Sequence, residues 1–410
     1  MNPLKGACII GQSGGPTAVI NASALGAIQA ALQSEQVTRV LGAANGIEGV
    51  LKEHLFDMAR EDPEELELLK YTPASALGSC RYKMAAPSAD DTDYRRLLEI
   101  FRKYNVRYFF YNGGNDSMDT CNKISKFMQQ SGYECRVIGI PKTIDNDLHG
   151  TDHCPGFGSA AKFIATSCME VHQDLRVYDK GRVTIVEIMG RHAGWLAGSA
   201  ALATYAGAGP DLVYLPEVPF RMEEFWQDVD RIYRQNGSCM VAVSEGVQYA
   251  DGRFVAESGD RDVFGHTQLG GLGAMLAESV KRQTGAKVRS IELSLLQRCA
   301  SHVASKTDID EAYMAGKAAI SGQTDKMVAF ERITENGIYS CKTKLIGLGE
   351  VANVEKLVPR EWINARGNGV EQPFIDYVLP LIQGETAMQK ECSLPRFAKL
   401  RKVPAKPEQR

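Results

Sequence analysis

Short apolar runs alternate with longer amphipathic stretches along most of this 410-residue chain. The runs are rich in β-branched or aromatic residues and stop at Gly, Pro or Asn, which predicts buried strands. The amphipathic stretches between them predict helices, the third of which begins with Ser117 as a capping residue. The predicted strands are 7–11, 107–114, 137–141, 182–190, 211–217 and 239–246, and the predicted helices are 21–34, 91–104, 117–130 and 222–236.

This alternation predicts an α/β fold in which parallel sheets are covered by helices on both faces. In such sheets, ligands bind beyond the carboxyl ends of the strands. Polar or glycine-rich loops follow five of the predicted strands, and we expect them to meet in one site. Their sequences are GQSGG (11–15), GGNDS (113–117), PKTIDND (141–147), MGR (189–191) and SEG (244–246).

Charge and cysteine content narrow the classes of function. The chain has 47 basic and 50 acidic residues, a net charge of −3. This argues against a nucleic-acid-binding protein, which would need a basic stripe, but it permits a local cationic pocket. The ten cysteines are scattered, with no C-x-x-C pair and no zinc-ligand spacing. Scattered thiols suit a reducing compartment, so we expect buried or surface thiols in a cytoplasmic protein.

No segment is expected to enter a membrane. The amino terminus lacks the apolar stretch of a signal peptide. The uncharged stretch 193–210 contains four glycines, so a buried helix is expected there rather than a membrane span. The basic stretch 394–410 is expected to be an ordered arm with a solvated end.

The first two loops suggest phosphate binding. A glycine loop between a strand and a helix lets backbone N–H groups approach a phosphate. A tight turn without a ligand explains residues 11–16 equally well. In the second loop, Asp116 is unusual because a carboxylate repels anions. It could support a helix cap, bind a metal or exclude an additional phosphate group.

The segment 141–147 is the most informative. Phosphoryl transfer to an alcohol needs a base for the hydroxyl proton, cationic stabilisation of the transferring oxygens and usually Mg²⁺. Asp145 or Asp147 could be the base and Lys142 the cation, whereas a solvated turn is the alternative. Five arginines could bind phosphate bidentately if the fold brings them to the site. They are Arg81, Arg182, Arg191, Arg289 and Arg298.

With these motifs in this order, from Ala7 to about Gly316, the sequence resembles the phosphofructokinase family. The most specific elements are TIDND at 143–147 and MGR at 189–191. The resemblance implies two Rossmann-like, three-layer αβα domains with the active site in the cleft between them. We expect a phosphoryl-donor domain at 1–157, completed by part of 298–350, a fructose 6-phosphate domain at 158–297 and a C-terminal extension at 351–410.

The resemblance also implies roles for individual residues. Asp145 matches the general base, and Asp147 matches the second carboxylate, which helps to hold Mg²⁺. Thr143 matches a contact to the substrate and to the transferring group. Glu245 matches a ligand of the sugar hydroxyls. The remaining expected contacts are Gly15, Arg81, Gly114, Asp116, Ser117 and Lys142 for the donor, and Met189, Gly190, Arg191, Arg289 and Arg298 for fructose 6-phosphate. Arg182 matches an arginine that reaches a neighbouring subunit's site, so a homodimer or homotetramer is expected.

Two positions address the choice of phosphoryl donor. ATP-using members of the family generally have glycine where this chain has Asp116 and Lys142, whereas pyrophosphate users have Asp and Lys. The resemblance therefore implies reversible phosphoryl transfer from pyrophosphate to the C1 hydroxyl of fructose 6-phosphate. An ATP-dependent enzyme and an enzyme that prefers sedoheptulose 7-phosphate remain alternatives.

The chain departs from the family pattern at three places. Asn115 stands where many members have Asp, and an amide is a poorer Mg²⁺ ligand than a carboxylate. Leu295 stands where many have His or Tyr, which could leave room for a longer sugar phosphate. Pro16-Thr17-Ala18 differs from the usual residues after the first glycine pair.

Two other classes of function are less well supported by the sequence. An NAD-binding oxidoreductase would need an acidic residue at the end of a second strand, and 37–46 reads VTRVLGAANG. A non-catalytic regulatory subunit would be expected to lack the base, and Asp145 is present.

Overall fold

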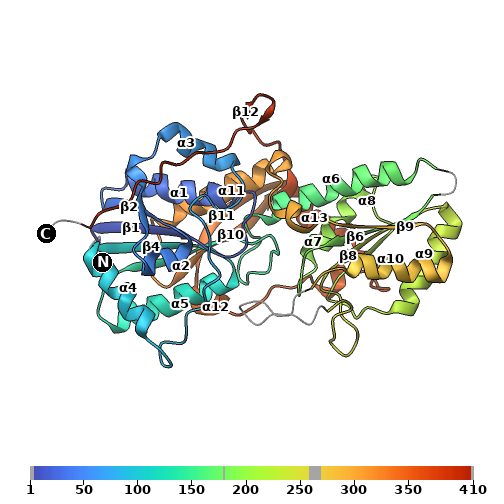
Figure 1. Cartoon of the computed structure of the whole chain (residues 1–410), viewed down its shortest axis with the longest axis horizontal. Coiled ribbons are helices and arrows are strands. Elements are labelled where there is room, and N and C mark those ends of the chain that lie inside the picture. The colour runs from blue at the N-terminus through green and yellow to red at the C-terminus, as the bar shows by residue number, and fades with distance from the viewer. Residues whose placement is uncertain (1–3, 179–180, 258–268, 408–410) are drawn as a thin grey trace.

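The computed structural model describes residues 4–178, 181–257 and 269–407 and forms two α/β lobes that lie side by side (Figure 1). Within these residues, one sheet has seven strands in the order β11-β10-β5-β4-β1-β2-β3 and another has four in the order β7-β8-β6-β9. The central strands of both sheets are parallel, while β3 and β11 are antiparallel edge strands of the larger sheet. The predicted α/β class is confirmed.

The first lobe is built on the larger sheet. Its strands are β1 (Gly6–Gln12), β2 (Val37–Ala43), β3 (Leu55–Asp57), β4 (Val106–Gly113), β5 (Arg136–Pro141), β10 (Lys326–Glu335) and β11 (Ile338–Gly347). Its helices are α1 (Ile20–Gln33), α2 (Gly46–Leu51), α3 (Pro63–Glu67), α4 (Thr92–Lys103), α5 (Asn115–Gln130), α11 (Lys306–Ala319) and α12 (Leu348–Val351).

Alternation along β4 explains why this sheet is covered on both faces. Tyr108 and Phe110 pack with α1 and α11, whereas Phe109 and Tyr111 pack with α4 and α5 on the other face. Successive side chains of a strand point to opposite faces, so a strand that is apolar at every position must be buried on both.

The second lobe carries the four-stranded sheet. Its strands are β6 (Val183–Ile188), β7 (Leu212–Tyr214), β8 (Cys239–Ser244) and β9 (Val288–Glu292), and its helices are α7 (Trp195–Ser199), α8 (Ala201–Tyr205), α9 (Met222–Asn236), α10 (Leu272–Thr284) and α13 (Gln372–Val378). One face packs against α7, α13 and the long α6 (Phe157–Leu175), the other against α9 and α10.

The chain crosses between the lobes several times. Helix α6 runs from the first lobe along the second (Figure 1). After α13 and the small hairpin of β12 (Lys390–Glu391) and β13 (Leu394–Pro395), the chain returns to the first lobe. There the backbone of Val403 and Ala405 pairs with Asp57 and Leu55 of β3. The ordered arm predicted for this stretch is therefore present through residue 407.

Two local predictions need correction. Helix α5 begins at Asn115, and Gly114 occupies the capping position without a side-chain hydrogen bond. Ser117 is thus inside the first turn and is not the cap. The stretch 193–210 contains two short helices, α7 and α8, rather than one, with α7 buried.

The remaining predictions concern thiols and membrane segments. The ten cysteines are free in the described chain, and seven are buried. No helix in the described ranges has the length and apolar character needed to cross a bilayer.

Candidate active site

The loops that follow β1, β4, β5, β6 and β8 open into one cavity of about 620 Å³. Because all five strands are parallel within their sheets, their carboxyl ends face the space between the two lobes. The cavity is lined by most of the residues predicted from the sequence. These are Gly15, Arg81, Gly114, Asn115, Asp116, Ser117, Lys142, Thr143, Asp145, Asp147, Met189, Arg191, Glu245 and Arg298.

Three predicted residues do not line this cavity. Gly190 lies just behind it, where its N–H donates to Glu245 Oε1 (3.3 Å). Arg182 precedes β6 and pairs with Asp174, at the opposite end of the strand from the cavity. Arg289 is an exposed residue of β9 that lies beside Thr184, near the start of β6. Neither Arg182 nor Arg289 can contact a ligand in the cavity of its own chain.

The two carboxylates of the β5 loop share the cavity because of the residue between them. Asn146 has φ of +54°, a left-handed conformation that asparagine tolerates better than most residues. Its buried side chain accepts from Cys154 N–H (3.0 Å) and donates to Tyr377 Oη (2.9 Å). This turn lets the side chains of Asp145 and Asp147 both reach the cavity.

The protonation of Asp145 is set by its surroundings. Burial, followed by repulsion from Asp147 and Glu245, raises the pKa of Asp145 to about 7. Its own backbone N–H donates to Thr143 Oγ1 (3.1 Å), which fixes the turn. A carboxyl group with a pKa near neutrality is well matched to general base catalysis.

Lys142 is a buried cation with only 3% of its surface exposed. Its Nζ donates to the carbonyl of Gly15 (2.6 Å), which links the β5 loop to the glycine loop after β1. Burial lowers the pKa of Lys142 to about 8, although Asp145 and Asp147 oppose that shift. The ammonium group therefore lies between the glycine loop and the carboxylates.

The arginines of the cavity include a buried donor. The Nε of Arg191 has no hydrogen-bond partner in the described structure. A buried, unpaired N–H in a cavity suits an anionic ligand. Arg298 lies against the glycine loop, since a Cβ on Gly15 would meet its Nη1 at 3.0 Å. Burial, then Arg81, lowers the pKa of Arg298.

The two candidate metal ligands differ in availability. Asp147 Oδ1 is buried and has no hydrogen-bond partner among the described residues, and its pKa is raised mainly by burial. An unpaired carboxylate oxygen suits a hard divalent cation. The Asn115 amide is engaged instead: its oxygen accepts from Asn353 N–H (3.0 Å) and its nitrogen donates to the carbonyl of Val354 (3.1 Å). The site fits a cation through Asp147 rather than through Asn115.

The cavity also contains residues that the sequence did not suggest. Tyr82, His192, Asn353 and Glu355 line it. His192 is next to the MGR motif, so proximity could have indicated it. Asn353 and Glu355 follow α12, far along the chain, and no motif points to them. Leu295, considered as a sugar-phosphate neighbour, is 57% exposed and is not a lining residue.

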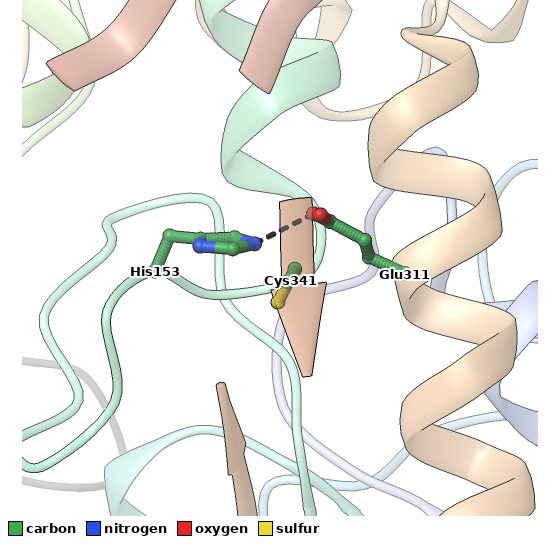
Figure 2. A group of neighbouring side chains, drawn as sticks. All are labelled: His153, Glu311 and Cys341. Atoms are coloured by element: carbon green, nitrogen blue, oxygen red, sulfur yellow. Dashed lines mark hydrogen bonds and ion pairs between the residues drawn. The ribbon is translucent and has the colours of Figure 1, made fainter. Parts of the chain in front are cut away.

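A second group of ligating side chains lies outside the cavity. His153, Glu311 and Cys341 come together from the loop after β5, from α11 and from β11 (Figure 2). His153 Nε2 lies 2.7 Å from Glu311 Oε2, and Nδ1 lies 2.8 Å from Asp152 Oδ2. Both ring nitrogens are thus occupied by carboxylates, which leaves no ring lone pair for a metal.

Comparisons with known proteins agree on one family. Residues 7–321 match the sequence model described as phosphofructokinase. A pyrophosphate–fructose 6-phosphate 1-phosphotransferase of Halomonas elongata is 45% identical over 399 residues, 95% of each chain. One from Methylococcus capsulatus is 45% identical over 397 residues, 95% of this chain and 94% of that protein. The crystal structure of a pyrophosphate-dependent phosphofructokinase from Nitrosospira multiformis superposes with a TM-score of 0.90 at 39% identity, covering 99% of both chains.

Proposed function

The chain belongs to the phosphofructokinase family, and from that premise we propose that it transfers a phosphoryl group from pyrophosphate to the C1 hydroxyl of fructose 6-phosphate. The products are fructose 1,6-bisphosphate and phosphate. Relatives that are 45% identical over nearly the whole chain carry this activity in their names. The reaction exchanges the P–O–P bond of pyrophosphate for a phosphate ester of the sugar without the binding energy of a nucleotide, and we propose that it runs in both directions.

The observation that carries this proposal is the meeting of Asp145 and Lys142 in one cavity. Asp145 accepts the proton of the C1 hydroxyl while the oxygen of that hydroxyl attacks the terminal phosphorus of pyrophosphate. The bond to the bridging oxygen breaks, and phosphate leaves. Lys142 stabilises the negative charge on the oxygens of the transferring group. Arg298, which the resemblance assigns to the 6-phosphate of the sugar, lies beside Gly15, and we propose that it also stabilises this charge.

Donor selection rests on Asp116 and Lys142. Asp116 lies in the first turn of α5, at the edge of the glycine loops. Its carboxylate repels the additional phosphate of a nucleotide, whereas Lys142 offsets the charge of a bare diphosphate. Gly15, Arg81, Gly114 and Ser117 complete the donor subsite on the first lobe.

The sugar phosphate binds on the second lobe. Met189, Gly190 and Arg191 form its loop, and Glu245 accepts hydrogen bonds from the sugar hydroxyls. Burial raises the pKa of Glu245, while the Gly190 N–H bond opposes that shift. Arg182 and Arg289 lie too far away to act in their own cavity, so they act only if a second subunit brings them to it. We propose, as the resemblance implies for Arg182, that this chain forms a homodimer or homotetramer.

Mg²⁺ is the expected cofactor, with Asp147 as its protein ligand. A bound divalent cation neutralises the charge that develops on the phosphoryl oxygens. Thr143 orients the turn and contacts the transferring group. We propose that residues 1–157 with part of 298–350 bind the donor and that residues 158–297 bind fructose 6-phosphate.

Steady-state turnover of the purified protein tests the proposal. Fructose 6-phosphate and sedoheptulose 7-phosphate are each supplied with pyrophosphate or with ATP, and formation of the bisphosphate is followed with and without a chelator. We expect turnover with pyrophosphate and fructose 6-phosphate, loss of turnover with the chelator and less than about 1% as much turnover with ATP, the two decades that follow from a difference of about 3 kcal/mol. Faster turnover with ATP than with pyrophosphate would overturn the donor assignment.

A further inference from the structure

One segment outside the matched family region contacts three loops of the cavity. Residues 353–358, here called the strap, follow α12 and run in irregular conformation between the two lobes. The family match ends at residue 321. The roles assigned above therefore leave the strap without a function, although Asn353 and Glu355 line the cavity.

The strap first holds the donor loop. Asn353 N–H and the Val354 carbonyl bind both ends of the Asn115 amide, at 3.0 and 3.1 Å. The Asn353 side chain also reaches Asp119 Oδ1 (3.5 Å), one turn further along α5. These contacts fix the first turn of α5, which carries Asp116.

The strap next holds the catalytic loop by its backbone. Lys356 N–H donates to the carbonyl of Asp147 (2.7 Å), and Glu355 forms an antiparallel bridge with Leu148. The strap thus behaves as a short additional strand beside the residues that follow Asp145. Backbone hydrogen bonds of this kind fix a loop without a contribution from its side chains.

The ammonium group of Lys356 also forms hydrogen bonds with other residues of that loop. Its Nζ donates to the carbonyl of Asp152 (2.7 Å) and to Asn146 Oδ1 (3.3 Å), with Thr151 O at 3.4 Å and Tyr377 Oη at 3.5 Å. Tyr377 itself accepts from Asn146 Nδ2 and donates to Asp152 O. Lys356 and Tyr377 therefore hold the side chain of Asn146, the left-handed residue between the two carboxylates, by hydrogen bonds.

The strap finally ties this assembly to the second lobe. His192 Nδ1 lies 3.0 Å from Glu355 Oε1, and Trp195 Nε1 donates to the carbonyl of Lys356 (2.8 Å). Val358 N–H donates to Glu217 Oε1, which also accepts from Gly194 N–H. Both His192 and Gly194 follow directly after the sugar-phosphate loop.

We propose that Lys356 is a positioning residue for phosphoryl transfer, acting through Asn146 with the support of Tyr377. The inference rests on the proposed function, because it assumes that Asp145 is the base. Lys356 is not a lining residue, so it acts on the geometry of the carboxylates rather than on a substrate. A displacement of the base of about 1 Å is enough to lower a rate by about 100-fold.

The test compares Lys356→Met with the wild-type enzyme and with Lys342→Met as a matched control. Lys342 is an exposed lysine of β11 that pairs with Glu331 and does not line the cavity. Removal of the Lys356 ammonium is expected to lower kcat by about 10- to 100-fold with KM values for both substrates within about threefold. Hydrogen–deuterium exchange over peptides 143–156 is expected to rise, while Lys342→Met matches the wild type in both measurements.

Tyr377→Phe provides a milder second variant if Lys356→Met does not fold. It removes only the hydroxyl that accepts from Asn146, and it should lower kcat in the same manner. When both changes are combined, the loss should be less than the product of the single losses, because both act through one side chain. A kcat within about twofold of wild type in both single variants would overturn the proposal, as would KM changes without a fall in kcat.

The proposed function and this inference fail separately. Absence of turnover with pyrophosphate in the wild type would overturn the proposed function. Hydrogen–deuterium exchange over 143–156 would still decide whether Lys356 holds the loop. Faster exchange in Lys356→Met than in the wild type supports the contact between Lys356 and Asn146 as the cause, and unchanged exchange overturns it.

Discussion

At the scale of single residues, we propose that one buried cation and one exposed carboxylate govern the choice of donor. Lys142 is held at the glycine loop by its bond to Gly15, and Asp116 lies in the first turn of α5. Replacement of both by glycine should lower kcat/KM for pyrophosphate by one to two decades, since a charge-assisted hydrogen bond contributes about 1.5–3 kcal/mol. The same change should raise kcat/KM for ATP.

The two single variants are the controls for this double change. Asp116→Gly alone should relieve the exclusion of ATP while keeping most pyrophosphate activity, whereas Lys142→Gly alone should lower turnover with both donors. Full pyrophosphate activity in the double variant would contradict the account of donor choice.

The base assignment gives a second prediction at this scale. Asp145→Asn should lower kcat by about 10²–10⁴-fold, the contribution typical of a general base. Since the pKa of Asp145 is raised to about 7, the ionised fraction of this carboxylate falls as pH drops through that value. The wild-type kcat/KM should therefore fall as pH drops through about 7, and steady-state rates from about pH 5.5 to 8 measure this limb.

A matched carboxylate serves as the control. Asp90→Asn removes an exposed acid that accepts a hydrogen bond from Thr92 N–H and does not line the cavity, and should leave both kcat and the acidic limb unchanged. Near-normal turnover of Asp145→Asn would show that another group takes the proton.

At the scale of secondary-structure elements, the sequence predicts those strands and helices whose apolar residues form a clear run or a regular repeat. The six predicted strands correspond to β1, β4, β5, β6, β7 and β8, with ends shifted by a few residues. Strand β9 was missed because its five residues are all exposed or partly exposed at a sheet edge and show no apolar run. The β10–β11 hairpin had a usable signal, since Asn336-Gly337 takes positive φ at both turn residues.

The candidate site likewise has one part that the sequence predicts and another part that it does not. The loops at the strand ends were predictable because parallel strands bring their carboxyl ends together. The hydrogen bond between Lys356 and Asn146 joins residues 210 positions apart in the sequence. Nothing in the local sequence VANVEKLVP predicts this contact. Long-range tertiary contacts of this type have no periodicity from which to be inferred.

The crossing of α1 and α11 gives a prediction for packing. A Cβ on Gly316 would lie 1.9 Å from the Ser23 carbonyl, and one on Gly26 would lie 2.2 Å from the Tyr313 carbonyl. The two helices therefore touch through their backbones. Gly316→Ala should force them apart and lower the free energy of unfolding by about 1–3 kcal/mol, measurable as a lower midpoint of thermal unfolding.

Gly349→Ala is the matched control for this substitution. Gly349 lies in α12, where the nearest heavy atom to an added Cβ would be Asn122 Oδ1 at 4.0 Å. Alanine there should be neutral or slightly stabilising, because it favours the helix relative to glycine. A thermal midpoint that falls equally in both variants would argue against the close backbone contact.

At the scale of the whole molecule, a buried charged network joins elements from distant parts of the chain. Asp152 and His153 lie after β5, Glu311 on α11 (Figure 2), and Arg332 on β10. Arg332 donates to both oxygens of Asp152 (3.1 Å each for the shortest bonds) and to the carbonyl of Tyr377, near the end of α13. The network therefore links the first lobe to the helix that packs on the second.

His153 makes this network sensitive to pH. Burial disfavours its charged form, but hydrogen bonds to Asp152 and Glu311 outweigh that effect and raise the pKa of His153. The pKa of Asp152 lies at about 2, because the bonds from His153 and Arg332 outweigh its burial. Asp152 contributes stability above its ordinary pKa of about 3.9 and loses it as pH falls toward about 2, so the two residues act in separate pH windows.

The folded protein thus binds the His153 proton more tightly than the unfolded chain does. Its contribution is complete below the ordinary histidine pKa of about 6.5 and is lost as pH rises through the raised pKa, by up to about 1.4 kcal/mol per pH unit. Denaturant unfolding of wild type and His153→Gln from about pH 6 to 9 should show a difference in unfolding free energy that shrinks with rising pH. His54→Gln, at an exposed position, should follow the wild type throughout. A difference between wild type and His153→Gln that stays constant across this range would contradict the raised pKa, because it would mean that His153 binds its proton equally well in the folded and the unfolded chain.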